Sequence, residues 1–234
     1  MRRDNQQLQH RGMTTFLSQL DVLIAERSIL QHPFYQAWQR GELTRDDLAR
    51  YARLYYPHVA AFPGYLEATA AKAEDVATRS ALADNLQDEL KNPAPHPELW
   101  LDFAEALGSE RSAVAAQPAS PQVSRTVAAF DALCQRSLAS GLTALYCYES
   151  QQPLVAQEKI RGLRDSYGVT SEAGLRYFAV HATADVEHRE AERAALGRCL
   201  EAGTVPAEIF SAAEEALDAY WNLLDAVAPA NSGC

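Results

Sequence analysis

Two histidines and an aspartate recur in one stretch of the chain at the spacing of a helical face. His181, Asp185 and His188 are separated by four and then by three residues, so on an α-helix they lie within about 60° of one another. We expect the two imidazoles and the carboxylate to converge on one point. This mixture suits iron, manganese or zinc, and with open positions it is typical of oxygen-activating iron.

The same triplet also fits a solvated polar face of a helix. Glu187, Arg189 and Glu190 lie beside it, and histidine is a common surface residue. From the triplet alone, metal binding and a plain surface face both stay open.

Three residues elsewhere in the chain extend the possible ligand set. Glu89 and His96 bracket a proline-rich break, and Glu149 lies in an otherwise apolar stretch where an unpaired carboxylate would be costly to bury. Alternatively, Glu149 pairs with Lys159 or another base, and Glu89 is a surface acid beside Asp88. Together with the triplet, these residues supply three histidines and three carboxylates, which suffice for two metal ions. A ferritin-like bundle is disfavoured, because such bundles use Glu-x-x-His twice. Here only residues 185–188 have that form, with Asp185 in place of the glutamate.

Tyrosines are the second feature with possible chemistry. Most are expected to be structural, because tyrosine at helical spacing usually packs in the core with its hydroxyl on a partner. A phenol beside an oxygen-activating metal is oxidisable, however, and a buried lysine next to it can be neutral and nucleophilic. From composition alone, the ordinary interpretation of Lys159 is a surface lysine. The tyrosines in question are Tyr35, Tyr51, Tyr55, Tyr56, Tyr146, Tyr148 and Tyr177.

The elements that must position these residues are predicted to be helices. Apolar residues recur at intervals of three and four almost everywhere, and strand-like alternation is scarce. Thr44, followed by two aspartates, is a good N-cap. We expect an all-α domain of seven or eight helices, with residues 109–120 as a surface linker. The expected helical ranges are 44–70, 75–91, 97–108, 121–139, 140–167, 171–202 and 206–227.

Composition bounds the class of protein. The chain has 234 residues, is 47% hydrophobic and carries a formal net charge of −10, so nucleic acid and anionic lipid are not expected partners. No segment approaches the roughly 20 apolar residues of a membrane span, and the four cysteines form no CxxC pair. We expect a cytoplasmic protein with reduced thiols. One domain over residues 14–227 is predicted, between flexible segments at 1–13 and 228–234.

Several short motifs, in this order, resemble the Chlamydia protein associating with death domains (CADD) and its bacterial relatives. These proteins are haem-oxygenase-like dimetal oxidases, with TenA and PqqC proteins as more distant relatives. The resemblance runs from about residue 14 to residue 227. The motifs are His32-Pro33-Phe34-Tyr35, Trp38-Gln39-Arg40-Gly41-Glu42-Leu43-Thr44, Tyr55-Tyr56-Pro57-His58, Ala61-Phe62-Pro63, Asp84-Asn85-Leu86, Tyr148-Glu149-Ser150-Gln151, Glu158-Lys159-Ile160-Arg161-Gly162-Leu163 and the helix with His181, Asp185 and His188.

The resemblance implies a haem-oxygenase-like helical bundle without haem, holding an Fe/Fe or Mn/Fe centre. It also implies an activity: an oxygen-dependent para-aminobenzoate synthase of folate biosynthesis that uses an external reductant and cuts out one of its own tyrosines. The matching tyrosine is Tyr35, and Lys159 matches the lysine implicated as amino donor. Tyr51 and Tyr177 match further tyrosines near the metals. The metal ligands of the family fall on Glu89, His96, Glu149, His181, Asp185 and His188.

Two other functions stay open at this stage. The same centre can act on an external small molecule, as other dimetal oxidases of this fold do, or the scaffold can be a non-catalytic interaction protein. Residues 90–95 depart from the family in composition, which leaves the setting of His96 open. A homodimer formed through an apolar face is expected. Death-domain binding is a host–pathogen property that these residues do not imply.

Overall fold

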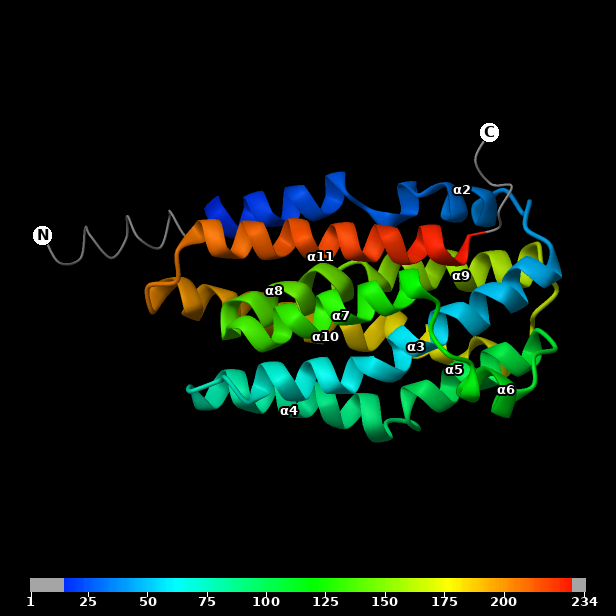
Figure 1. Ribbon diagram of the computed structural model, residues 1–234, viewed down its shortest axis with the longest axis horizontal. Coiled ribbons are helices and arrows are strands. Elements are labelled where there is room, and N and C mark those ends of the chain that lie inside the picture. Colours follow the sequence, from blue (N-terminus) through cyan, green and yellow to red (C-terminus); the bar gives the residue numbers. More distant parts are fainter. Residues whose placement is uncertain (1–14, 229–234) are drawn as a thin grey trace, which may run out of the picture.

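The computed structural model describes residues 15–228. Every regular element in that range is a helix, so the predicted all-α class is confirmed (Figure 1). The segment predicted to be flexible at 1–13, and the tail from residue 229 onward, lie outside the described residues. Within the described range, no helix is both long enough and apolar enough to cross a membrane.

The helices follow the predicted order closely. Residues 15–26 form the first described helical segment. The elements after it are η1 (Ile29–Gln31), α2 (Pro33–Gln39), α3 (Arg45–Ala70), α4 (Val76–Lys91), α5 (His96–Ala106), α6 (Arg111–Ala116), α7 (Pro121–Arg136), α8 (Leu138–Glu149), α9 (Gln152–Asp165), α10 (Glu172–Glu201) and α11 (Pro206–Val227).

Two of the predicted boundaries are wrong. The single helix expected over 140–167 is divided into α8 and α9, because Pro153 has no N–H to donate to the Glu149 carbonyl four residues earlier. The linker expected over 109–120 contains the short helix α6. Its N-cap is Glu110, whose carboxylate accepts from the N–H groups of Ser112 and Ala113.

Local sequence explains why α3 begins where it does. The Thr44 hydroxyl accepts from the N–H of Asp47, and the Asp47 carboxylate accepts from the N–H of Thr44. This reciprocal pair is a capping box, which satisfies N–H groups that have no partner at a helix start. The predicted N-cap at Thr44 is therefore confirmed.

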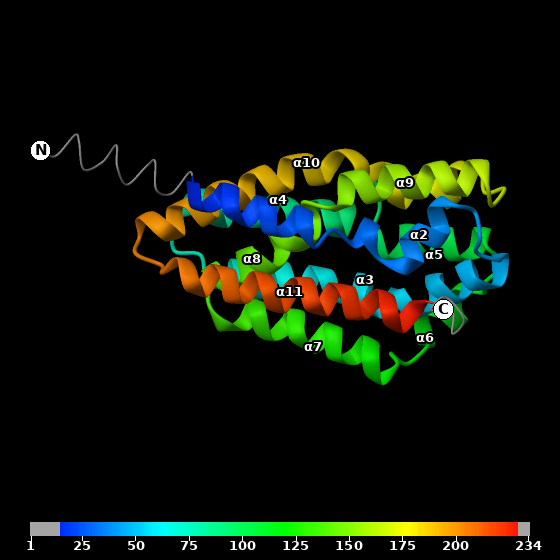
Figure 2. The ribbon, with the colours of Figure 1, turned by 90° about the horizontal axis from the view of Figure 1, so that it is seen from above.

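Helix α10 is the longest element and brings most of the others together. It packs against α4, α5, α8 and α9, while α11 covers α7 and α8 on the other side (Figures 1 and 2). Every residue of α8 from Ala139 to Glu149 is buried. A helix buried on all sides lies inside the core, so polar groups at its end need partners in the interior.

Candidate metal centre

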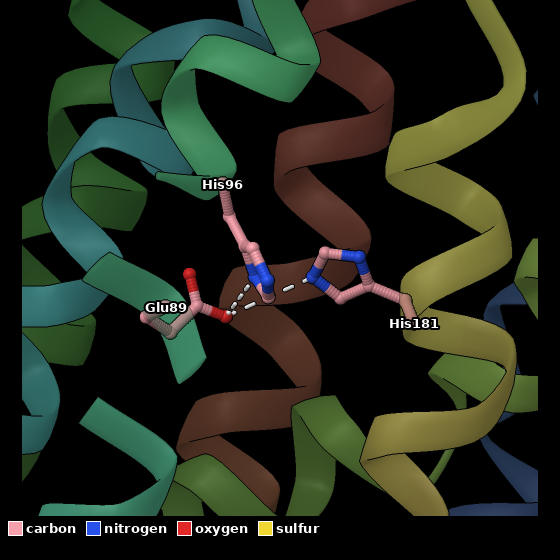
Figure 3. A group of neighbouring side chains, drawn as sticks. All are labelled: Glu89, His96 and His181. Carbon is pink, nitrogen blue, oxygen red and sulfur yellow. Dashed lines mark ion pairs between the residues drawn. The ribbon is translucent and has the colours of Figure 1, made fainter. Parts of the chain in front are cut away.

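The first cluster joins the end of α4, the start of α5 and the middle of α10. His96 Nδ1 lies 2.8 Å from Glu89 Oε1, and His181 Nε2 lies 3.7 Å from the same oxygen (Figure 3). All three side chains are buried, with 1–4% of each residue exposed. The interpretation of Glu89 as a surface acid is therefore wrong.

The second cluster joins the end of α8 to α10. His188 Nδ1 lies 3.4 Å from Glu149 Oε1 and 3.5 Å from Asp185 Oδ1, and all three residues are buried. In each cluster, one ligand atom from every residue lies within 4.8 Å of the others. The structure thus brings the six candidate ligands together as two sets of three.

The expectation that His181, Asp185 and His188 converge on one point is wrong. They share a face of α10, but seven residues of helix rise about 10.5 Å, which is too far for one ion. His181 faces the first cluster, whereas Asp185 and His188 face the second. Because the three residues are buried, the alternative of a solvated face is also wrong.

In each of the three histidines, the ring nitrogen that points away from the cluster makes a hydrogen bond. An N–H on that side donates to a carbonyl or carboxylate, which leaves the inner nitrogen to face the ligand set, an arrangement typical of metal-binding histidines. The three contacts are His96 Nε2 to the Asn92 carbonyl at 3.1 Å, His181 Nδ1 to the Tyr177 carbonyl at 2.7 Å and His188 Nε2 to Asp88 Oδ2 at 3.1 Å.

The inner atoms lack ordinary partners. His96 Nδ1, His188 Nδ1 and Asp185 Oδ2 are buried and make no hydrogen bond among the described residues. A carboxylate facing an imidazole lone pair needs a cation between the two, either a proton or a metal ion. The donor set of nitrogen and oxygen atoms fits iron or manganese.

The pKa values show how protons fill this role without a metal. Burial by itself would raise the pKa of Glu89, but the facing imidazoles of His181 and His96 lower it to about 2. Burial disfavours the charged form of His181, yet Asp185 and Glu89 raise its pKa to about 9. The carboxylates around His188 likewise outweigh its burial and raise its pKa to about 11. Metal binding must therefore displace protons from these histidines.

Polar neighbours of the second cluster were not predicted from the sequence. Asn85 Nδ2 donates to both carboxylate oxygens of Glu149, at 3.0 and 3.1 Å. Glu192 is buried, and its burial, together with the charge of Glu149, raises its pKa well above the ordinary value. Glu192 lies four residues after His188, so continuing the same spacing by one turn identifies it.

Lys159 lies in a separate, aromatic compartment. Only 3% of the residue is exposed, and its Nζ donates to the Tyr51 hydroxyl. Burial lowers its pKa well below the ordinary value for lysine. The surface interpretation of Lys159, and its pairing with Glu149, are therefore wrong. From Lys159 Nζ to the ring centroids, the distances are 5.4 Å for Tyr35, 4.7 Å for Tyr51, 5.4 Å for Tyr55, 5.6 Å for Trp100 and 5.0 Å for Phe178.

Tyr35 belongs to this compartment and not to the ligand clusters. It is fully buried, its hydroxyl makes no hydrogen bond of ordinary geometry among the described residues, and burial raises its pKa. Tyr177 and Trp100 connect the two regions. The Tyr177 ring centroid lies 4.1 Å from that of His181 and 4.8 Å from that of Trp100. Trp100 could not be identified from spacing, because its position depends on how α5 packs.

The family model described as iron-containing redox enzyme matches residues 49–221. A 4-aminobenzoate synthase of Chlamydia trachomatis serovar D is 38% identical over 94% of both chains. Another, from Chlamydia muridarum, is 44% identical over 76% of both chains, and one from Nitrosomonas europaea is 37% identical over 91% of both.

Solved structures share the fold at lower sequence identity. A TenA homologue from Pseudomonas syringae has a TM-score of 0.74 at 16% identity, covering 94% of this chain and 92% of that one. A CADD-like protein from Nostoc punctiforme has a TM-score of 0.71 at 19% identity, covering 93% and 97%. The chain belongs to the iron-containing redox enzymes of haem-oxygenase-like fold and, within them, to the family of the CADD-like 4-aminobenzoate synthases.

Proposed function

We propose that this protein is an oxygen-dependent 4-aminobenzoate synthase that serves folate synthesis and uses its own Tyr35 as the source of the aromatic ring. Lys159 supplies the amino nitrogen, and an external reductant supplies electrons. The observation that carries the proposal is the buried Lys159 amine beside the Tyr35 ring, with a pKa that burial lowers, in a relative of named 4-aminobenzoate synthases. Each chain reacts once, because Tyr35 is consumed.

The two ligand clusters would hold the metals. Glu89, His96 and His181 would bind one ion, and a second set of three residues would bind the other. An Fe/Fe or Mn/Fe pair, once bound, would supply the oxidising power by activating O2 with electrons from the reductant. The second set consists of Glu149, Asp185 and His188.

Aromatic side chains support electron transfer between the two regions. The Tyr177 ring lies beside the His181 ring, Trp100 lies against Tyr177, and the Tyr51 ring centroid lies 5.5 Å from that of Trp100. Such close rings give a path for oxidation of Tyr35 without direct contact with the metals. We therefore assign Tyr51 and Tyr177 to this path.

The state of Lys159 suits a nitrogen donor. An amine attacks through its lone pair, which the ammonium form lacks. The aromatic surroundings disfavour the ammonium form by desolvation, and the Tyr51 hydroxyl holds the amine in place. Burial thus shifts the amine toward the uncharged form, which can act as a nucleophile.

The size of the cavity at the metal ligands favours an internal over an external substrate. The space lined by Glu89, Glu149, Tyr177 and their neighbours is about 10 Å³, roughly enough for one water molecule. A larger groove of about 560 Å³ is lined by residues of the 21–30 segment, α8, α9 and α10, and by none of the candidate ligands. An aromatic acid does not fit this inner space.

Isotope labelling tests the proposal directly. Protein made with ring-¹³C tyrosine and side-chain-¹⁵N lysine is loaded with iron, or iron and manganese, and given reductant and O2. We expect at most one 4-aminobenzoate per chain by mass spectrometry, carrying both labels, and a peptide map with a side-chain loss at Tyr35. Unlabelled product would contradict an internal source of ring and nitrogen.

Tyr35→Phe is the matching variant, and Tyr65→Phe is its control. Tyr65 is also buried, but its hydroxyl bonds to the Val127 carbonyl, away from Lys159. We expect Tyr35→Phe to bind metal and give no product, and Tyr65→Phe to give product. Product from Tyr35→Phe, or repeated turnover with an added small molecule, would favour an external substrate.

A further inference from the structure

Helix α4 contacts both ligand clusters but offers a ligand to only one of them. Glu89 faces the first cluster. Asn85 and Asp88, on the same helix, instead make hydrogen bonds to members of the second cluster. Neither is among the six candidate ligands.

The Asp88 contact selects which nitrogen of His188 is free. Asp88 Oδ2 lies 3.1 Å from His188 Nε2. A carboxylate accepts only, so Nε2 keeps its proton, and Nδ1 is the nitrogen that faces Glu149 and Asp185. The corresponding contacts of His96 and His181 go to backbone carbonyls. His188 is therefore the only histidine of the six candidate ligands whose outer contact is a side chain.

Asp88 is itself held in place. Its other oxygen, Oδ1, accepts from Asn92 Nδ2 at 2.8 Å, and the Asn92 carbonyl accepts from His96. One turn earlier on the same helix, the buried Asn85 donates to both oxygens of Glu149. The end of α4 thus contacts two candidate ligands of the second cluster, Glu149 and His188.

We infer that Asn85 and Asp88 are positioning residues for the second metal ion and set its affinity through Glu149 and His188. The inference rests on the proposed dimetal centre. Outer partners of metal ligands commonly contribute 10- to 100-fold to metal affinity. Loss of either side chain is therefore expected to lower the affinity for one of the two metal ions by about that factor. The affinity for the other ion should stay unchanged.

The test is a titration of metal-depleted full-length protein with Mn²⁺, in which free Mn²⁺ is followed by electron paramagnetic resonance. We expect Asp88→Ala to lower the affinity for one Mn²⁺ ion about 10- to 100-fold. Asp88→Asn retains an oxygen acceptor for His188 and should stay within about threefold of the wild type. Asp84→Ala, an exposed residue one turn earlier on α4, is the control and should bind both ions normally.

Three outcomes separate the possibilities. Wild-type affinity for both ions in Asp88→Ala, or an Asp88→Asn variant as weak as Asp88→Ala, would overturn the positioning role. If circular dichroism shows that Asp88→Ala does not fold, Asn85→Leu replaces it, because this variant removes the hydrogen bonds to Glu149. Normal binding of both ions by Asn85→Leu would then overturn the inference. A wild-type protein that binds two ions but yields no 4-aminobenzoate would refute the proposed function and leave the inference standing.

Discussion

The two buried polar regions of this molecule are stabilised in opposite ways. In the ligand clusters, carboxylates and imidazoles compensate one another, so that the pKa of Glu89 falls to about 2 while that of His181 rises to about 9. No carboxylate within residues 15–228 pairs with Lys159, and the surrounding rings lower its pKa by desolvation. One region therefore holds compensating charges that a metal ion could replace, whereas the other disfavours charge on the amine.

Replacing a candidate metal ligand should give the largest difference between the two regions. We expect His181→Ala to lose the first ion, with affinity reduced by more than about 100-fold, because loss of a ligand should exceed the effect of an outer partner. Glu187→Ala, an exposed neighbour on α10, should keep both ions. Metal content after dialysis, measured by mass spectrometry, distinguishes the two. Two tightly bound ions in His181→Ala would contradict the assignment of the first cluster.

Proton competition should also act on the ligand clusters. Metal must displace protons from His181 and His188, whose pKa values without metal are about 9 and 11. Affinity should therefore fall as the pH is lowered from 8 to 6, by up to about tenfold per pH unit for each proton displaced. Mn²⁺ titrations at several pH values measure the slope. A flat profile would mean that these histidines are not ligands.

The candidate ligands could be picked out from the sequence, but how they group into two clusters could not. His181, Asp185 and His188 lie on one helix, where spacing alone defines a shared face. Which of them meets Glu89 and which meets Glu149 depends on how α4, α8 and α10 pack, and here the prediction of a single point was wrong.

The setting of Lys159 was harder to predict than the fold. Its neighbours in sequence, Glu158 and Arg161, are polar and indicate a surface. Its burial results from the packing of α9 against α10 and α2, which brings rings from distant elements around its amine. Helical periodicity, by contrast, is local, so most helix bounds were predicted within a few residues.

Gly162 tests how closely α9 must approach α2. A Cβ at this position would lie 2.4 Å from Trp38 Nε1, so Gly162→Ala must push the helices apart. We expect a loss of about 1–3 kcal/mol in the free energy of unfolding, as for other overpacked cores. Gly64→Ala in α3, where a Cβ meets nothing within 4 Å, should instead gain about 0.5–1 kcal/mol. Urea unfolding measures the change in the free energy of unfolding for each variant. Changes of the same sign in the two variants would contradict the close packing of α9 against α2.

At Lys159, the expected difference in stability depends on pH. In the unfolded chain, this lysine binds a proton up to its ordinary pKa of about 10.4. In the folded protein, burial lowers the pKa, so folding releases a proton between the two values, and wild-type stability rises with pH through that window. Lys159→Met has no such proton and removes a buried polar group.

This variant should therefore be more stable than the wild type near pH 7, by about 1–3 kcal/mol, and the gap should narrow as the pH approaches 10. Urea unfolding of both metal-depleted proteins at pH 6, 7, 8 and 9 measures the gap. Lys91→Met, at an exposed site on α4, should show a difference within about 0.5 kcal/mol at every pH. A gap for Lys159→Met that stays constant with pH would mean that the amine is charged in the folded protein, and the aromatic compartment would then bind a cation instead of preserving a nucleophile.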